Sequence, residues 1–187
     1  MDRRARIVEL VRALALERRD EPFTLTSGEV SYEYVDAKLA IARGSDLETA
    51  AVAGVDALAQ IGVTAYEAVG GMTMGADPLA HAIAMVADVH WFSVRKQPKG
   101  HGTQRSLEGG RLDPGTPAVL VDDVVTTGGS IQQAYNVLDD LGIRVVGALT
   151  LVDRGDVAGA FFSDREVPYV ALATYRDLDI PPVGATA

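Results

Sequence analysis

The chain lacks cysteine altogether, which excludes disulfides, a thiol nucleophile and a cysteine-based metal site. It also lacks an apolar run of the ~20 residues that a membrane span requires, so we expect no membrane contact. Basic charge is scarce: the formal net charge is −9 at pH 7, which argues against nonspecific binding to nucleic acid. Arginines near the N-terminus are not followed by the apolar segment of a signal peptide, and we expect a cytoplasmic protein.

The length of 187 residues suits one substantial core, and no Pro/Ser-rich linker divides the chain. We therefore expect a single domain, with an N-terminal helix and a hood-like segment over 1–40, a core over 41–175 and a tail over 176–187. One face of the N-terminal helix would carry Ile7, Leu10, Val11 and Leu14. The tail after Ile180 contains two prolines and a glycine and is expected to be loosely ordered.

Apolar segments of strand length alternate with segments of helical periodicity. Strands are predicted at residues 23–25, 32–36, 65–69, 91–94, 118–121, 145–152 and 167–174. Helices are predicted over about 3–18, from a Ser45–Glu48 capping box to Gly62, from a cap at Asp77-Pro78 onward, and over an apolar stripe that ends at Gly142. This alternation predicts an α/β fold with a mostly parallel central sheet flanked by helices.

The most informative segment is AVLVDDVVTTGGSIQQAY, residues 118–135. Its apolar start suits an interior strand, and Asp122 and Asp123 follow at the carboxyl end, where ligands bind in open α/β sheets. Adjacent carboxylates there can accept hydrogen bonds from two neighbouring hydroxyls, such as a ribose diol. Residues 126–130 then offer hydroxyls and unhindered backbone N–H groups at a helix start, which suits a phosphate. The segment predicts a site for a phosphorylated sugar.

A second segment, VRKQPKGHG at residues 94–102, places Arg95, Lys96, Lys99 and His101 after a predicted strand. Its proline and glycines prevent helix formation. Residues 95–111 carry a local net charge of +4 in an otherwise acidic chain. Because salt screens the more distant acidic side chains, this basic cluster can dominate the potential in an adjoining cleft. Taken alone, the segment fits a solvated basic loop equally well. Considered together with the predicted phosphate site at residues 126–130, the segment favours a clamp for a diphosphate.

Together these segments resemble the motifs of type I phosphoribosyltransferases, and VRKQPKGHG resembles the RKxxKxHG loop of the orotate phosphoribosyltransferases. Three further stretches are similar to that family. Residues 23–36 resemble the segment that covers the pyrimidine ring, and residues 70–76 resemble a loop on the pyrophosphate side. Val152-Asp153-Arg154 resembles the strand end whose arginine meets the orotate carboxylate. The matches run from about residue 20 to 155 in the family's order.

The resemblance implies a phosphoribosyltransferase that transfers 5-phosphoribosyl from phosphoribosyl pyrophosphate (PRPP) to orotate, giving orotidine 5′-monophosphate and pyrophosphate in pyrimidine (UMP) biosynthesis. It implies catalytic roles for Lys99, His101 and Asp123. The implied orotate contacts are Thr126, Arg154, Tyr34 and Val35. The implied PRPP contacts are Arg95, Lys96, Lys99, His101, Asp122, Asp123, Val124, Val125, Thr126, Thr127, Gly128, Gly129 and Ser130.

The resemblance also implies a cofactor and an assembly. Mg²⁺ would be held mainly by the substrate, with Asp122 and Asp123 as the protein groups nearest to it. Family members are homodimers, and the resemblance implies that loop 96–109 reaches the neighbouring active site.

Two positions depart from the family pattern, because Thr26 and Met74 stand where some members carry lysine. Met72 and Met74 are expected to pack under their loop. Two alternatives stay open: transfer to another base, or a regulator that senses PRPP or nucleotides without turnover. Arg154 and residues 23–36 favour orotate, and the loop around Lys99 favours an enzyme.

Overall fold

A six-stranded sheet forms the centre of the computed structural model, which describes residues 2–25, 28–96 and 106–183. Its strand order is β5-β4-β3-β6-β7-β8, and every neighbouring pair is parallel except β4 and β5. The strands are β3 Ala68–Met72, β4 His90–Val94, β5 Leu107–Gly109, β6 Pro117–Val125, β7 Arg144–Asp153 and β8 Tyr169–Thr174. The predicted fold class, α/β with a mostly parallel sheet, is confirmed.

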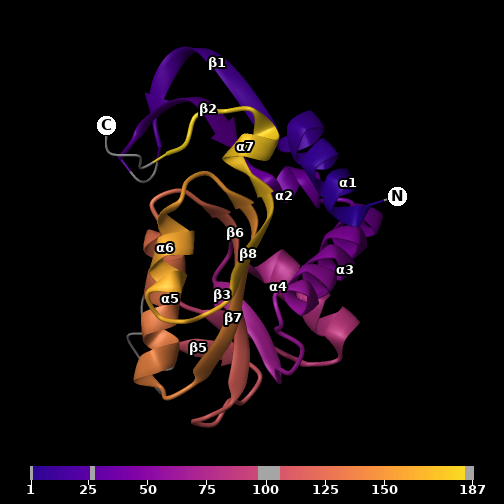
Figure 1. The fold of residues 1–187 in the computed structure, drawn as a ribbon, viewed down its shortest axis with the longest axis vertical. Helices are drawn as coiled ribbons and strands as arrows, with labels where there is room; N and C mark the ends of the chain where they lie inside the picture. The colour runs from indigo at the N-terminus through magenta and orange to yellow at the C-terminus, as the bar shows by residue number, and fades with distance from the viewer. Residues whose placement is uncertain (1, 26–27, 97–105, 184–187) are drawn as a thin grey trace.

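Helices cover both faces of this sheet (Figure 1). They are α3 Gly44–Gln60, α4 Asp77–Ala87, α5 Gly129–Asp140 and α6 Val157–Ser163, while the short helix α7 Tyr175–Leu178 follows β8 and lies beside the hood. Alternate residues of β6 enter two different cores: Val119 and Val121 pack in the cluster that contains α3 and α4, while Ala118 and Leu120 pack in the cluster that contains α5 and α6. Burial on both faces explains why this strand is apolar at every position from 118 to 121.

The chain leaves β3 and β6 in opposite directions across the sheet. From β3 it crosses through α4 to β4, and from β6 it crosses through α5 to β7, although β3 and β6 are neighbours. A parallel sheet opens a crevice at the carboxyl ends of strands where the order reverses in this way. The ends of β3 and β6 are therefore the expected place for a ligand.

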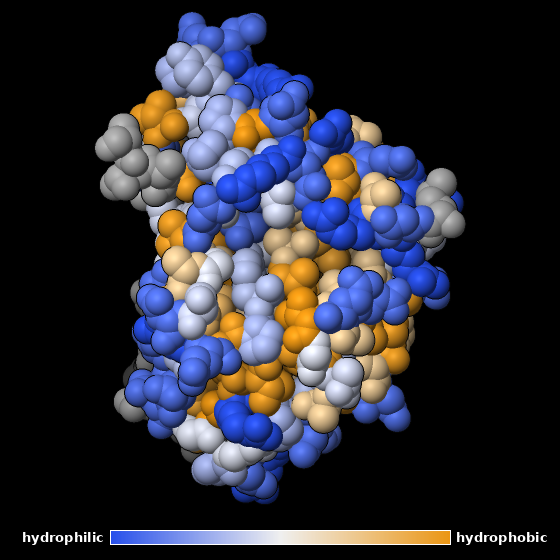
Figure 2. Space-filling model, viewed as in Figure 1, coloured by the Kyte–Doolittle hydropathy of each residue, from blue (hydrophilic) through white to orange (hydrophobic). Residues whose placement is uncertain are grey.

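A second, two-stranded sheet forms a hood beyond this edge of the central sheet (Figure 1). Its strands, β1 Leu16–Thr24 and β2 Val30–Val35, pair antiparallel, and the short helix α2 Ala37–Ala40 leads from it to the core. The space-filling view is mostly hydrophilic over the hood, whereas hydrophobic residues gather lower down, between the two helical layers (Figure 2). Among the described residues, no helix combines the length and apolarity needed to cross a membrane.

The N-terminal helix is shorter than predicted. The α-helix α1 Arg3–Leu10 passes into a π-helical turn, η1 Val11–Ala15, and β1 begins at Leu16. Ile7, Leu10 and Val11 are buried as expected, but Leu14 is 52% exposed, because the change of helical pitch turns it away from the core. Pairing with β2 draws residues 16–18 into the strand although two of the three are charged, and the register shifts between Arg18 and Phe23.

Three other expectations are wrong. Helix α3 begins at Gly44, one residue before the predicted cap, so Ser45 lies in the first turn and its hydroxyl caps nothing. Asp77 lies inside α4 and accepts hydrogen bonds from Thr73 Oγ1 and Ser93 Oγ, both at 2.7 Å. The beginning of the tail is anchored rather than loose, since Val183 is buried and its amide donates to the Arg154 carbonyl at 2.7 Å.

Candidate active site

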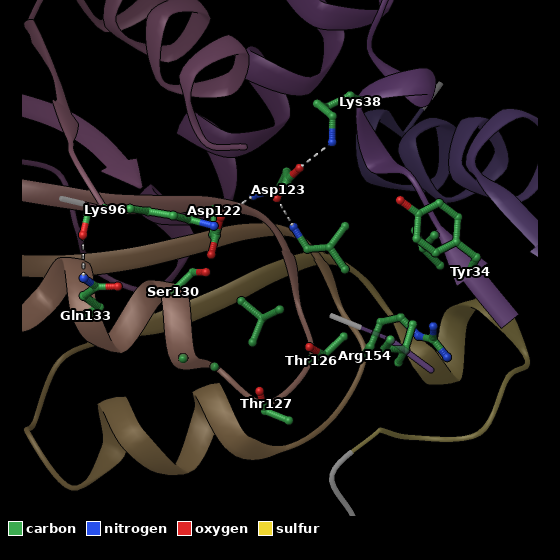
Figure 3. Close-up of a pocket in the computed structure, with 16 residues that line it drawn as sticks. Tyr34, Lys38, Lys96, Asp122, Asp123, Thr126, Thr127, Ser130, Gln133 and Arg154 are labelled. Carbon is green, nitrogen blue, oxygen red and sulfur yellow. Dashed lines mark hydrogen bonds and ion pairs between the residues drawn. The ribbon is translucent and has the colours of Figure 1, made fainter. Parts of the chain in front are cut away.

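A cavity of about 680 Å³ lies at the carboxyl end of β6, between the hood and the start of α5 (Figure 3). The residues that line it come from the hood, from the ends of β4 and β6, from the β6–α5 loop and from the end of β7. They are Leu25, Tyr34, Val35, Lys38, Lys96, Asp122, Asp123, Val124, Val125, Thr126, Thr127, Gly128, Gly129, Ser130, Gln133 and Arg154. The cavity is therefore where the topology predicts a ligand.

Asp122 and Asp123 lie inside β6, which continues to Val125, rather than beyond its end. The Asp123 amide donates to Asp122 Oδ1 at 3.0 Å, and the Val124 amide donates to Asp123 Oδ1 at 2.8 Å. Asp122 is buried, and this burial, together with the neighbouring charge of Asp123, raises the pKa of Asp122 to about 7. Lys96 opposes this rise. The pair thus presents strong oxygen acceptors whose combined charge depends on pH.

The raised pKa of Asp122 predicts a pH-dependent stability of the ligand-free chain. Because the folded pKa lies above the unfolded value, the native state binds more protons, and its stabilisation is lost as the pH rises toward 7 and beyond. Between pH 5 and pH 8, wild type should lose on the order of 2 kcal/mol of unfolding free energy relative to Asp122→Asn. Urea denaturation at several pH values measures this difference, and parallel pH profiles for the two proteins would refute it.

The β6–α5 loop exposes backbone donors to the cavity. Gly128 has a left-handed backbone, with φ of 78°, and caps α5 at its N-terminus, a conformation that glycine adopts without strain. No side chain caps this end of α5, so the first N–H groups of the helix are available to an anion. The hydroxyls of Thr126, Thr127 and Ser130 border the same space (Figure 3). The loop has the donors that a phosphate group needs.

The predicted basic clamp is only partly placed by the structure. Lys96 lines the cavity, and its carbonyl accepts a hydrogen bond from Gln133 Nε2 at 3.4 Å. Arg95 is not among the lining residues, and its Nε donates to Glu108 Oε1 at 2.8 Å. Glu108 belongs to β5, the edge strand next to β4. Lys99 and His101 lie outside the described residues.

Arg154 joins the end of β7 to the hood. The side chain is buried, its Nη1 donates to the Glu33 carbonyl at 2.7 Å, and its Nη2 donates to Ser31 Oγ at 3.4 Å. Burial lowers the pKa of this guanidinium, an effect that Glu33 opposes. Its Nε has no hydrogen-bond partner among the described residues, and the residue lines the cavity (Figure 3). A buried donor without an acceptor is rare in native structures and marks this guanidinium as a candidate for ligand binding.

The preceding residue fixes the backbone from which Arg154 extends. Asp153 accepts hydrogen bonds from the Tyr169 hydroxyl at 2.7 Å and from the Gly155 amide at 3.0 Å. The Tyr169 oxygen also lies 2.8 Å from Thr150 Oγ1. Asp153 therefore acts inside the protein and is not available to a ligand.

The loop between β3 and α4 approaches the aspartate pair from the neighbouring strand. A Cβ atom added to Gly75 would lie 2.6 Å from Asp123 Oδ1, so any larger residue there would have to displace this carboxylate. Met72 is buried as predicted, but Met74 is 79% exposed, and the expectation that it packs under the loop is wrong.

Comparisons with known proteins identify this combination of sheet, hood and loop. A family model described as "Phosphoribosyl transferase domain" matches residues 53–160. The chain is 35% identical over 181 residues to orotate phosphoribosyltransferase of Aquifex aeolicus, with 94% of this chain and 97% of the relative covered. It is 38% identical over 188 residues to the enzyme of that name in Corynebacterium glutamicum, with 96% of each covered. The chain belongs to the orotate phosphoribosyltransferase family.

A solved structure agrees with this membership. Orotate phosphoribosyltransferase of Mycobacterium tuberculosis in complex with PRPP superposes with a TM-score of 0.75 and 31% identity, covering 95% of this chain and 99% of that one. Family membership confirms the recognition made from the segments at 94–102 and 118–135. It also confirms the fold that this recognition implied.

The sequence interpretation missed two residues that line the cavity, Lys38 and Gln133, and it included Leu25 only within the ring-covering segment 23–36. Lys38 Nζ lies 3.1 Å from Asp123 Oδ2 and 3.0 Å from Asp36 Oδ1. Gln133 had a detectable signal, because it lies one helical turn after Gly129 and so faces the same side of α5. Nothing in the local sequence places Lys38 beside a strand 85 residues away.

The described residues hold no cluster of three or more metal-ligating side chains of the His, Cys, Asp and Glu types. Two adjacent carboxylates are nevertheless present, and Mg²⁺ commonly takes one or two protein carboxylates together with substrate oxygens and water. The oxygen donors of Asp122 and Asp123 therefore fit an ion that a phosphorylated substrate brings with it.

Proposed function

We propose that this chain transfers 5-phosphoribosyl from PRPP to a ring nitrogen of orotate, producing orotidine 5′-monophosphate and pyrophosphate in pyrimidine biosynthesis. The observation that supports this most strongly is that one cavity combines the Asp122–Asp123 pair with the donor-rich loop at residues 126–130. The first suits a ribose diol and the second suits the 5′-phosphate of the same molecule. The PRPP complex of the M. tuberculosis relative is consistent with this assignment.

In this proposal PRPP lies along the end of β6. Asp122 and Asp123 accept hydrogen bonds from the ribose hydroxyls, and the backbone from Val124 to Ser130 surrounds the 5′-phosphate at the start of α5. The β3–α4 loop comes close to Asp123 at Gly75, and its N–H groups would serve the diphosphate. The chain thereby holds the anomeric carbon in a fixed position for attack.

Orotate would occupy the side of the cavity nearest the hood. Arg154 has an unpartnered Nε there and is the described arginine that lines the cavity, so it would bind the orotate carboxylate. Tyr34 and Val35 line the same side and would cover the ring, with Thr126 reaching it from the β6–α5 loop. A carboxylate on the base is the feature that this arrangement selects.

The departing pyrophosphate needs cations, because negative charge grows on it as the bond to the anomeric carbon breaks. Lys96 borders the cavity, and we assign Lys99 and His101, the catalytic residues proposed with Asp123, to the same clamp. Arg95 would join the clamp only after leaving Glu108. Mg²⁺, when bound with PRPP, would neutralise part of the diphosphate charge.

We further propose a homodimer in which the segment between Lys96 and β5 reaches the partner's active site. The predicted loop 96–109 is too long at its end, because residues 107–109 pair with β4 as strand β5. Support comes from an exposed apolar surface on α4 and β4, where Met85 is 74% and Trp91 41% exposed. His81, one turn before Met85, packs edge-on against Trp91 at 4.5 Å between ring centroids. A surface of this kind suits a second copy of the chain.

One domain spanning residues 1–187 remains our proposal, and the cytoplasmic location stays a prediction.

Orotate consumption, followed by ultraviolet absorbance with PRPP and Mg²⁺ supplied, tests the proposed function. Wild type should turn over orotate but not uracil, which lacks the carboxylate. Lys99→Ala should lose turnover while calorimetry still detects PRPP binding, because the loop acts on the leaving group. If orotate is not consumed although PRPP binds tightly, the assignment of orotate as the acceptor base is wrong, and other purines and pyrimidines are tested as acceptors. If no base is consumed, the chain is a PRPP sensor.

A further inference from the structure

Lys38 is a cation of the cavity that has no role in the proposed reaction. It lies on α2, where the hood joins the core, and its ammonium group is 3.1 Å from Asp123 Oδ2 and 3.0 Å from Asp36 Oδ1 (Figure 3). Burial lowers the pKa of Lys38, but hydrogen bonds to Asp36 and Asp123 outweigh this effect and raise it, so the group is charged at neutral pH. Its side chain is 50% exposed, so these two carboxylates, rather than tight packing, hold the ammonium in place.

The chain uses lysine sparingly. Its sequence contains 3 lysines among 17 basic residues. Lys38 and Lys96 both line this cavity, whereas Lys99 lies outside the described residues. A lysine ammonium is a compact, strongly hydrated charge on a flexible stem, unlike the planar guanidinium of arginine. Such a charge can exchange one anionic partner for another.

Asp123 is the point where Lys38 and the pyrophosphate-side loop meet. Lys38 contacts Oδ2 of this carboxylate, and Gly75 of the β3–α4 loop lies against Oδ1. A ribose hydroxyl or a cation that reaches Asp123 must compete with the Lys38 ammonium. A diphosphate bound along that loop would offer the displaced ammonium a new anionic partner beside the carboxylate that it leaves.

We propose that Lys38 is the counter-ion of Asp123 in the empty site and transfers to the diphosphate of PRPP when the ribose engages Asp123. This inference rests on the proposed function. The contact that it assigns to Lys38 would be made with PRPP but not with sugar phosphates that lack a diphosphate. The transfer moves no proton and breaks no covalent bond. It lets one side chain stabilise the empty site and then the loaded site.

Binding of two ligands to Lys38→Met, measured by isothermal titration calorimetry, tests the inference. Methionine keeps the apolar stem and removes the charge. Affinity for PRPP with Mg²⁺ should fall about tenfold, the range of one charge-assisted hydrogen bond. Affinity for ribose 5-phosphate, which has no diphosphate, should stay the same or rise, because Asp123 no longer has a competing partner. Lys38→Arg should recover most of the PRPP affinity.

Arg3→Met serves as the matched control, because it removes an exposed ion pair with Asp56. It should leave both affinities unchanged. Equal losses for PRPP and ribose 5-phosphate in Lys38→Met would overturn the inference and make Lys38 a residue that only positions Asp123. Unchanged affinities for both ligands would also overturn it. Wild-type protein that binds neither ligand would instead refute the proposed function.

Discussion

Asp123→Asn is expected to lower kcat/KM for PRPP about hundredfold while the fold stays intact, the range for loss of a charged hydrogen-bond acceptor in a site. Asparagine has the same shape and its Oδ1 can still accept the Val124 amide, which Asp123 accepts at 2.8 Å. The substitution removes the charge that would face the ribose in the proposed function and that pairs with Lys38 at 3.1 Å. The lost acceptor matters most in the transition state, when the ribose gains positive character.

Initial rates of orotate consumption at varied PRPP concentration measure this effect, with circular dichroism to confirm the fold. Asp156→Asn is the matched control, because Asp156 is an exposed aspartate whose ion pair with Arg176, at 3.4 Å, lies at the surface. The control should retain the wild-type kcat/KM. A kcat/KM for Asp123→Asn within threefold of the wild-type value would show that Asp123 has no catalytic role.

Gly71→Ala should abolish stable folding. Gly71 lies in the fully buried strand β3, and a Cβ added there would lie 1.9 Å from the Val121 carbonyl oxygen and 2.7 Å from Ala76 Cβ. The obstructing atoms include the backbone of β6, which cannot turn aside as a flexible side chain could. Overpacking that must separate two central strands should cost about 4 kcal/mol or more, a large part of the stability of an ordinary domain.

Thermal denaturation and the yield of folded protein measure this loss. Gly159→Ala is the matched control, since it makes the same chemical change in helix α6, where nothing lies within 4 Å of the added Cβ. The control should be neutral or slightly stabilising, because alanine favours a helix over glycine. A melting temperature for Gly71→Ala close to that of the control would contradict the close approach of β3 to β6.

The segment from 118 to 135 could be interpreted from sequence because its chemistry is local. Strand, aspartate pair, loop and helix follow one another without a gap, so their order along the chain is also their order in space. The apolar run at 118–121 predicts burial on both faces, and the glycines predict the unhindered loop. Even here, β6 extends past both aspartates, because pairing with β7 continues to Val125.

Contacts between distant segments could not be predicted in this way. Arg95 was assigned to the anion clamp, but the antiparallel addition of β5 brings Glu108 to it. Lys38 contacts Asp123 only because the hood folds over the end of β6. The start of β1, residues 16–18, depends on pairing with β2, since its charged residues carry no strand signal of their own. In each case the deciding interaction is tertiary and leaves no periodic pattern in the sequence.

The most direct test is to measure orotidine 5′-monophosphate and pyrophosphate together in one reaction of the purified protein with orotate, PRPP and Mg²⁺. We expect the two products in a one-to-one ratio, with neither formed when orotate or PRPP is omitted. Pyrophosphate release that does not depend on orotate, or PRPP binding without either product, would contradict phosphoribosyl transfer to orotate at this cavity.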